Sequence, residues 1–206
     1  MIKRLIFDVD NTIIEWKDRY LDAIKETVEE YKLDVDYLEI NNLIEEYEKY
    51  YNRFEEDNLI ELINKKMNIK VDKEFIEKWF ERLAKLTESD VKIGETIRYL
   101  SKKYELVILS NWFKENQKER LKRANLLQYF KEVYCGDNIL KPNEEAFKIA
   151  MNGRKAEECI MIGDNYKIDI EPSLSLEMKT IMITSKAIKE KDLICIKNVN
   201  ELRKIL

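Results

Sequence analysis

Hydrophobic residues recur along the chain with two different spacings, and the change between them lies near residue 90. Between residues 15 and 90 they recur every three or four positions, which is the period of an amphipathic helix. After residue 90, short apolar runs alternate with helical stretches, as in a parallel sheet whose strands are joined by helical crossovers. The pattern therefore predicts an α/β core of residues 1–14 and 91–206, interrupted by a helical insertion at residues 15–90.

Within the core, the apolar runs and the helical stretches define individual elements. Strands are expected at residues 3–7, 105–109, 132–135, 159–162, 180–183 and 193–196. Helices are expected at residues 93–103, 114–124, 143–151, 168–176 and 199–205. This alternation predicts a Rossmann-like parallel sheet with helices on both faces, and the insertion is expected to form an all-helical domain.

Polar residues predict where two helices of the insertion begin. Asn58, followed three residues later by Glu61, fits a variant of the capping box. Asp72 is a favourable N-cap for the next helix, because its carboxylate can accept hydrogen bonds from the first turn. The sequence thus places one helix start at each of these two positions.

Composition limits the class of protein further. The chain has 206 residues, of which 38% are charged and 45% hydrophobic, and it contains only four glycines and two prolines. These values predict a globular, soluble protein with long helices and short loops. The net charge of −4 gives no sign of a nucleic-acid partner. The oligomeric state cannot be deduced from these features.

The expected location is the cytoplasm. No apolar stretch approaches the length of about 18 residues that a membrane-spanning helix needs, so no membrane association is expected. The apolar run at the start is too short for a signal peptide. The three cysteines are widely spaced and odd in number, so they predict neither a disulfide framework nor a zinc site.

The chain contains no histidine, and this absence restricts its chemistry. Catalytic Ser-His and Cys-His pairs, imidazole zinc sites and imidazole acid–base catalysis are all excluded. Any catalysis must therefore use carboxylates, Lys, Ser, Thr, Tyr or Cys, together with an oxygen-ligated metal if a metal takes part.

Polar residues follow four of the predicted strands, at the edge of the sheet where ligands of open parallel sheets bind. They are Asp8 and Asp10 after the first strand, Ser110 and Asn111 after the second, Lys141 after the third, and Asp164 and Asp169 after the fourth. The topology is expected to bring these side chains together at one site.

This set of residues suits phosphoryl transfer through an aspartyl-phosphate. A carboxylate that attacks a phosphate dianion meets charge repulsion, which a Mg²⁺ ion bound between them would reduce. Asp8 and Asp164 can supply carboxylate ligands to Mg²⁺, and Asp10 can protonate the leaving oxygen if its pKa is raised. Suitable donors to the other phosphate oxygens are Ser110, Asn111 and Lys141.

Four short motifs in this chain resemble those of the haloacid dehalogenase superfamily. They are FDVDNT at residues 7–12, LSN at 109–111, KP at 141–142 and GDNYKID at 163–169. Their order and spacing match that superfamily over essentially the whole chain, and residues 109–147 are similar to its small-molecule phosphatase branch. The resemblance implies that residues 15–90 form a helical cap inserted after the first motif.

The resemblance also implies a role for each residue of the motifs. Asp8 would be the nucleophile, and Asp10 the general acid and base, whose backbone carbonyl also binds Mg²⁺. Ser110 and Lys141 would hold the phosphate. Asp164 would bind the metal, with Asp169 beside it, directly or through water. The substrate would be a small phosphorylated metabolite, such as a nucleotide or a sugar phosphate.

Other functions of the same fold are weighed against this one. A dehalogenase generally lacks the second aspartate, so Asp10 argues against that activity. Phosphomutase activity has no signature in the insertion, and a non-catalytic or regulatory binding module is the alternative from a different class. After the last motif, Glu171-Pro172-Ser173 replaces the small residues usual in the superfamily, which affects helix packing more than chemistry.

Three residues near the expected site allow two interpretations each. Trp112 either lines the pocket or packs beneath the insertion. Arg53 lies in a polar stretch between two helices, where it is exposed to solvent or meets a substrate anion. Trp16, at the start of the insertion, either stacks on a substrate or belongs to the core.

Overall fold

The central element of the protein is a parallel sheet. The computed structural model describes residues 1–47, 50–186 and 188–206, and within them six strands follow the order β3-β2-β1-β4-β5-β6. The strands are β1 (Arg4–Phe7), β2 (Glu105–Leu109), β3 (Glu132–Tyr134), β4 (Cys159–Gly163), β5 (Lys179–Ile183) and β6 (Leu193–Ile196). Every neighbouring pair is parallel, so the predicted Rossmann-like sheet is confirmed. Each predicted strand lies within one residue of its observed bounds.

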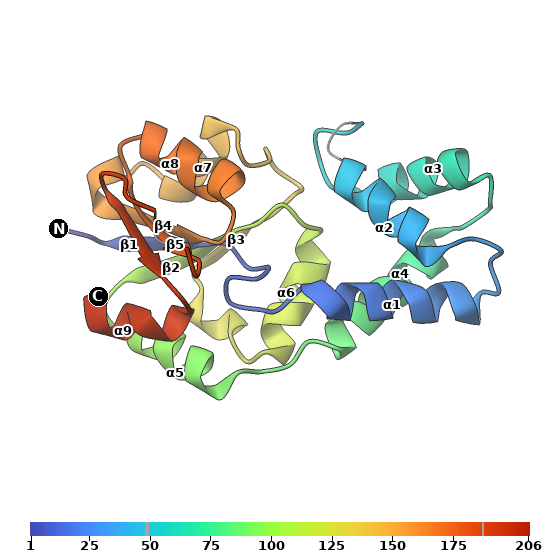
Figure 1. Ribbon diagram of the computed structural model, residues 1–206, viewed down its shortest axis with the longest axis horizontal. Helices are drawn as coiled ribbons and strands as arrows, with labels where there is room; N and C mark the ends of the chain where they lie inside the picture. The colour runs from blue at the N-terminus through green and yellow to red at the C-terminus, as the bar shows by residue number, and fades with distance from the viewer. Residues whose placement is uncertain (48–49, 187) are drawn as a thin grey trace.

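Helices cover both faces of this sheet, as the sequence predicts (Figure 1). One face is covered by α5 (Val91–Leu100), α6 (Lys114–Arg123) and α9 (Leu202–Ile205). The other face is covered by α7 (Glu144–Met151) and α8 (Glu171–Ser175). Short helical turns lie at Leu127–Tyr129, Ala156–Glu158, Tyr166–Ile170 and Val199–Glu201.

The alternation of side chains along β1 explains this arrangement. Leu5 and Phe7 belong to the apolar cluster on the α5 side, whereas Ile6 belongs to the cluster on the α7 side. All three are fully buried. A strand whose consecutive side chains are apolar must be covered on both faces, and Leu5, Ile6 and Phe7 meet this condition.

The helical insertion lies to one side of the sheet (Figure 1). It contains α1 (Lys17–Glu30), α2 (Tyr37–Glu46), α3 (Glu56–Met67) and α4 (Lys73–Lys85). These helices share an apolar cluster, which also takes in Trp112 and Phe113 from the loop after β2. The division of the chain into a core and a cap domain at residues 15–90 stays a prediction, but the helical character of this segment agrees with it.

The two predicted helix starts in the insertion have different outcomes. Asp72 is the N-cap of α4, and its Oδ1 accepts a hydrogen bond of 3.2 Å from the backbone N–H of Phe75. The capping box at Asn58 is wrong, because α3 begins at Glu56 and Asn58 lies inside its first turn. Two acids in that turn, Glu56 and Asp57, favour the earlier start through the helix dipole.

Two predicted core helices are less regular than expected. The helix expected at residues 168–176 consists of a π-helical turn, Tyr166–Ile170, followed by the short α8. Pro172 lies in the first turn of α8, where its missing N–H costs no hydrogen bond. The helix expected at residues 199–205 begins with a 3₁₀ turn. Among the described residues, no helix is both long and apolar enough to cross a membrane.

We expect Trp79→Ala to destabilise the protein strongly. Trp79 is fully buried in the apolar cluster of the insertion, so its removal loses burial and leaves a cavity. The free energy of unfolding, measured by urea denaturation, should fall by about 3–5 kcal/mol. Glu77→Ala, an exposed change on the same helix, is the control and should stay within about 0.5 kcal/mol of the wild type. Equal effects of the two variants would contradict the observed packing.

Candidate active site

The carboxyl ends of the strands open into a cavity of about 370 Å³. Every site residue predicted from the sequence lines it, namely Asp8, Asp10, Ser110, Asn111, Lys141, Asp164 and Asp169. They come from segments up to about 160 residues apart, and the strand order places their strands side by side. The predicted convergence at one edge of the sheet is therefore observed, while the individual roles stay predictions.

A tight turn after β1 allows both Asp8 and Asp10 to reach the cavity. The carbonyl of Val9 accepts hydrogen bonds from the N–H groups of Thr12, Ile13 and Ile14, at 3.2, 2.9 and 3.0 Å. Within this turn Asn11 has a φ of 58°, a left-handed conformation that asparagine tolerates better than most residues. The turn thus breaks the alternation of an extended Asp-Val-Asp segment, while the Val9 side chain stays buried.

Lys141 links two of the acids. Its Nζ lies 2.7 Å from Oδ1 of Asp8 and 2.6 Å from Oδ1 of Asp169. The lysine side chain is only 2% exposed, so this ammonium is almost completely removed from water. Burial alone would lower the pKa of Lys141, but the charges of Asp169 and Asp8 outweigh that effect and raise it. The lysine therefore stays charged and holds both carboxylates in place.

Asn111 fixes the backbone that carries this lysine. Its Nδ2 donates to the carbonyl of Lys141 at 2.7 Å, and its Oδ1 accepts from the N–H of Lys141 at 2.9 Å. This pair of hydrogen bonds joins the loop after β2 to the loop after β3. The contacts give Asn111 a structural task beside the predicted contact with substrate.

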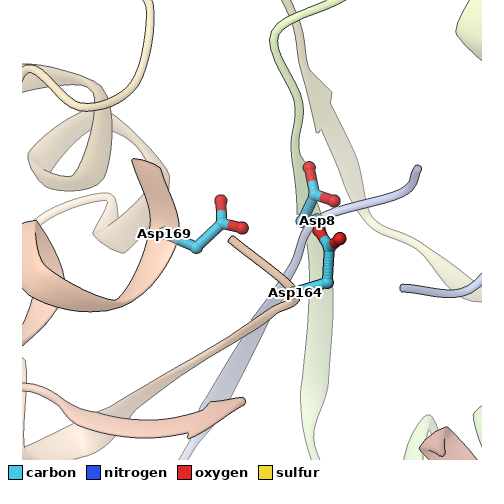
Figure 2. Close-up of side chains that lie close together, drawn as sticks. All are labelled: Asp8, Asp164 and Asp169. Carbon is cyan, nitrogen blue, oxygen red and sulfur yellow. The ribbon is translucent and has the colours of Figure 1, made fainter. Parts of the chain in front are cut away.

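Asp8, Asp164 and Asp169 form a cluster of carboxylates (Figure 2). Each offers an oxygen that lies within 4.8 Å of the others. Figure 2 shows Asp8 and Asp164 at the ends of adjacent strands, with Asp169 pointing toward them from a helical turn. Gly163 makes this approach possible, because a Cβ there would lie 2.4 Å from Oδ2 of Asp169.

The cluster fits a divalent cation with a preference for oxygen ligands, such as Mg²⁺. Lys141 and the backbone N–H of Asn165, at 3.1 Å, occupy the two oxygens of Asp169. Asp164, in contrast, forms no ion pair with any lysine or arginine that the structure describes. Asp164 is therefore the carboxylate best placed to bind the ion, because both oxygens of Asp8 also have partners, Lys141 at 2.7 Å and Thr12 at 3.2 Å.

The pKa values of these acids show how unfavourable their negative charges are without a cation. Burial, reinforced by the charge of Asp8, raises the pKa of Asp164 to about 7. Burial also raises the pKa of Asp169 to about 6, against the opposing effect of Lys141. A bound divalent cation would favour the charged forms, so its binding should strengthen as the pH rises through these values.

Asp10 lies apart from this cluster, in contact with two residues of α6. Nη1 of Arg120 donates to its Oδ1 at 2.5 Å, and Nε2 of Gln117 donates to its Oδ2 at 2.8 Å. Burial raises the pKa of Asp10, and the charge of Arg120 counteracts that rise. The predicted metal ligand at this position is the backbone carbonyl, and that role stays a prediction.

Sequence reasoning missed Gln117 and Arg120. Both are fully buried, although α6 is so polar that Leu121 is the single aliphatic residue in it. The two residues are three positions apart and so lie on one face of the helix. One signal was available in the sequence. The helix follows a motif and has too few apolar residues to form its buried face, which indicates that polar side chains are buried there.

The remaining lining of the cavity is largely apolar. It comes from Trp16, Ile44, Phe54, Trp112 and Ile168, together with Asn11 and Asn165. Trp112 is 3% exposed and contacts Trp16, with the ring centroids 4.6 Å apart. Both interpretations of Trp112 are therefore correct, since it lines the cavity and packs against the insertion. Arg53 is exposed and lines a separate cavity of about 730 Å³, which Lys141 also borders.

The profile of the haloacid dehalogenase-like hydrolases matches residues 5–183, which is most of the chain. The chain belongs to this family. Its solved relatives agree with the fold: YfnB, a HAD-hydrolase of Bacillus subtilis, has a TM-score of 0.77 at 20% identity. That comparison covers 99% of this chain and 98% of YfnB. The resemblance found in the four motifs is thereby confirmed.

Three relatives of the present chain are named for an activity. A glyceraldehyde 3-phosphate phosphatase of Methanocaldococcus jannaschii is 25% identical over 207 residues, which covers 92% of this chain and 88% of that protein. One of Methanothermobacter thermautotrophicus is 29% identical over 119 residues, covering 52% and 53%. The pyrophosphatase PpaX of Halalkalibacterium halodurans is 35% identical over 86 residues, covering 39% and 40%. The matches thus span about half or less of the last two relatives.

We expect Gly163→Ala to destabilise the site. The added Cβ would lie 2.4 to 2.7 Å from three atoms of the Asp169 side chain, which must then move away from Lys141. The free energy of unfolding should fall by roughly 1–3 kcal/mol in urea denaturation. Gly94→Ala in α5 is the matched control, since its Cβ would meet nothing within 4 Å. A Gly163 variant as stable as this control would show that the close approach is unnecessary.

Proposed function

We propose that this protein is a Mg²⁺-dependent phosphomonoester hydrolase that acts through an aspartyl-phosphate on Asp8. The observation that carries the proposal is the buried Lys141, which holds Asp8 and Asp169 at 2.7 and 2.6 Å beside Asp164. An immobilised carboxylate next to an oxygen-rich cation site has the parts that phosphoryl transfer requires. Membership of the family and the names of its relatives support the same reaction.

In the first half-reaction, a carboxylate oxygen of Asp8 attacks phosphorus, and the bond from phosphorus to the organic oxygen breaks. Thr12, which donates to Oδ2 of Asp8 at 3.2 Å, and Lys141 fix the direction of the attacking group. Ser110 and Lys141 would donate hydrogen bonds to the phosphate oxygens. Asp10 gives a proton to the leaving oxygen. Mg²⁺, when bound by Asp8 and Asp164, would reduce the repulsion between the carboxylate and the phosphate.

In the second half-reaction, water attacks the phosphorus of the aspartyl-phosphate and releases inorganic phosphate. Asp10, now deprotonated, accepts a proton from that water, and the carboxylate of Asp8 is restored. The same aspartate can serve both steps because its environment combines two opposing influences. Burial favours its neutral form, and Arg120 favours its charged form.

We infer that the substrate is compact, in the size range of a triose phosphate. The cavity of about 370 Å³ must hold the phosphate as well as the organic group. Beyond the acids and Lys141, no charged side chain of the described residues lines it, and five apolar side chains do. The two relatives named glyceraldehyde 3-phosphate phosphatase support this substrate class. A diphosphate, the substrate in PpaX's name, would bring a second anionic group into a site without a further cation.

Replacing the nucleophile tests the covalent mechanism. Asp8→Asn should lower kcat at least about 10³-fold, because an amide does not attack phosphorus. Phosphate release is the measurement, and mass spectrometry of the acid-quenched wild type should detect phosphate on the peptide that contains Asp8. The control is Asp137→Asn, an exposed aspartate paired with Lys114, which should match the wild type. A folded Asp8→Asn enzyme with normal turnover would show that a different residue attacks.

A substrate panel tests the reaction class and the size limit. Phosphate release should be compared for glyceraldehyde 3-phosphate, a hexose phosphate, AMP and pyrophosphate, with Mg²⁺ and with EDTA. We expect the triose phosphate to have the highest kcat/KM and EDTA to lower it at least about tenfold, because the carboxylates then repel the substrate. A preference for pyrophosphate or AMP would contradict the inferred substrate class. No release from any compound would contradict the hydrolase proposal itself.

A further inference from the structure

Arg120 is a buried arginine whose carboxylate partner lies in the active site. Its side chain is 1% exposed, and Nη1 lies 2.5 Å from Oδ1 of Asp10. The same Nη1 donates to Oε1 of Gln117 at 2.7 Å. Removing a guanidinium from water is costly. Replacing a buried ion pair by well-packed apolar residues is often neutral or even stabilising, so stability alone does not explain this pair. The burial of this charge therefore points to a task at Asp10.

The contacts from α6 engage both oxygens of the Asp10 carboxylate. Arg120 bonds Oδ1, and Nε2 of Gln117 donates to Oδ2 at 2.8 Å. Nε2 of Gln117 also donates to Oγ of Ser110 at 2.9 Å. A carboxylate held at both oxygens has one orientation. Through Gln117, that orientation is linked to Ser110, which we propose binds the phosphate.

Trp16 packs against the other side of this arginine. The guanidinium carbon lies 4.9 Å from the centre of the Trp16 ring, which is within the range of a cation–π contact. Nε and Nη2 of Arg120 are buried and have no hydrogen-bond partner among the described residues. The contact with the Trp16 ring is therefore a further favourable interaction of the guanidinium beside its bonds through Nη1. Trp16 also lines the cavity and directly precedes α1.

We propose that Arg120 is a positioning residue, which holds the carboxylate of Asp10 in place for proton transfer to the leaving oxygen. The inference rests on the proposed function of Asp10 as the general acid. Arg120 is not among the residues that line the cavity, so it acts through Asp10 and not on the substrate. Without it, Asp10 can rotate about its side-chain bonds, and the proton is no longer held next to the leaving oxygen.

The dependence of rate on the leaving group distinguishes this role from a merely structural one. An alkyl phosphate needs a proton on its leaving oxygen, whereas para-nitrophenol is a strong enough acid to leave as an anion. The ratio kcat/KM reports the steps up to departure of the alcohol or phenol. Arg120→Lys and Arg120→Met should lower kcat/KM for the alkyl phosphate by roughly 10-fold to 100-fold. The loss for para-nitrophenyl phosphate should be at least tenfold smaller.

Matched variants make the experiment decisive. Arg123→Lys on the same helix, where the exposed arginine pairs with Glu119, should change neither substrate's kcat/KM. If Arg120→Met does not fold, Arg120→Lys, which keeps a positive charge at the position, carries the test. Equal losses for both substrates in a folded Arg120→Lys enzyme would overturn the proposal.

A double variant separates this inference from the proposed function. Once Asp10 is replaced by Asn, adding Arg120→Lys should cost at most about twofold more for the alkyl phosphate, because the two residues act as one unit. A further loss as large as in the wild-type background would overturn the positioning role of Arg120. If Asp10→Asn alone lowers kcat/KM equally for both substrates, the acid function of Asp10 fails, and the positioning role fails with it.

Discussion

The ammonium of Lys141 is the group on which the arrangement of the site depends. Three carboxylates gather at the carboxyl ends of β1 and β4, and such a cluster is stable only if positive charge stands among them. Lys141 supplies one such charge, and its backbone is fixed by Asn111 from the neighbouring loop. Asp164 forms no ion pair with Lys141; burial and the charge of Asp8 raise its pKa, and a cation bound there would favour its charged form.

A second buried cation, which does not itself line the cavity, follows the same logic at Asp10. Arg120 neutralises Asp10 as Lys141 neutralises Asp8 and Asp169. The two cations differ in their hydrogen-bond partners. The guanidinium of Arg120 donates to a carboxylate and an amide, whereas the compact ammonium of Lys141 donates to two carboxylates. The two aspartates of one short motif therefore experience different surroundings, although a single residue separates them.

Much of this architecture was predictable from local patterns. The strands were readable because apolar runs ended at polar motifs, and the convergence of Asp8, Ser110, Lys141 and Asp164 followed from the topology of parallel sheets. The contacts of Arg120 were not readable, because an arginine in a polar helix normally faces water. The start of α3 was misplaced because acids at Glu56 and Asp57 outweighed the capping pattern at Asn58. These errors concern tertiary contacts and competing local signals, which periodicity does not contain.

The loop after β2 has a consequence for how such proteins can diversify. Four consecutive residues have different surroundings: Ser110 and Asn111 line the cavity, while Trp112 and Phe113 enter the apolar cluster of the helical insertion. An exchange of the insertion for one from another family member would leave two large aromatic side chains without their partners. The insertion is therefore not an independent module, and new specificity would arise more readily by changes within it than by its replacement.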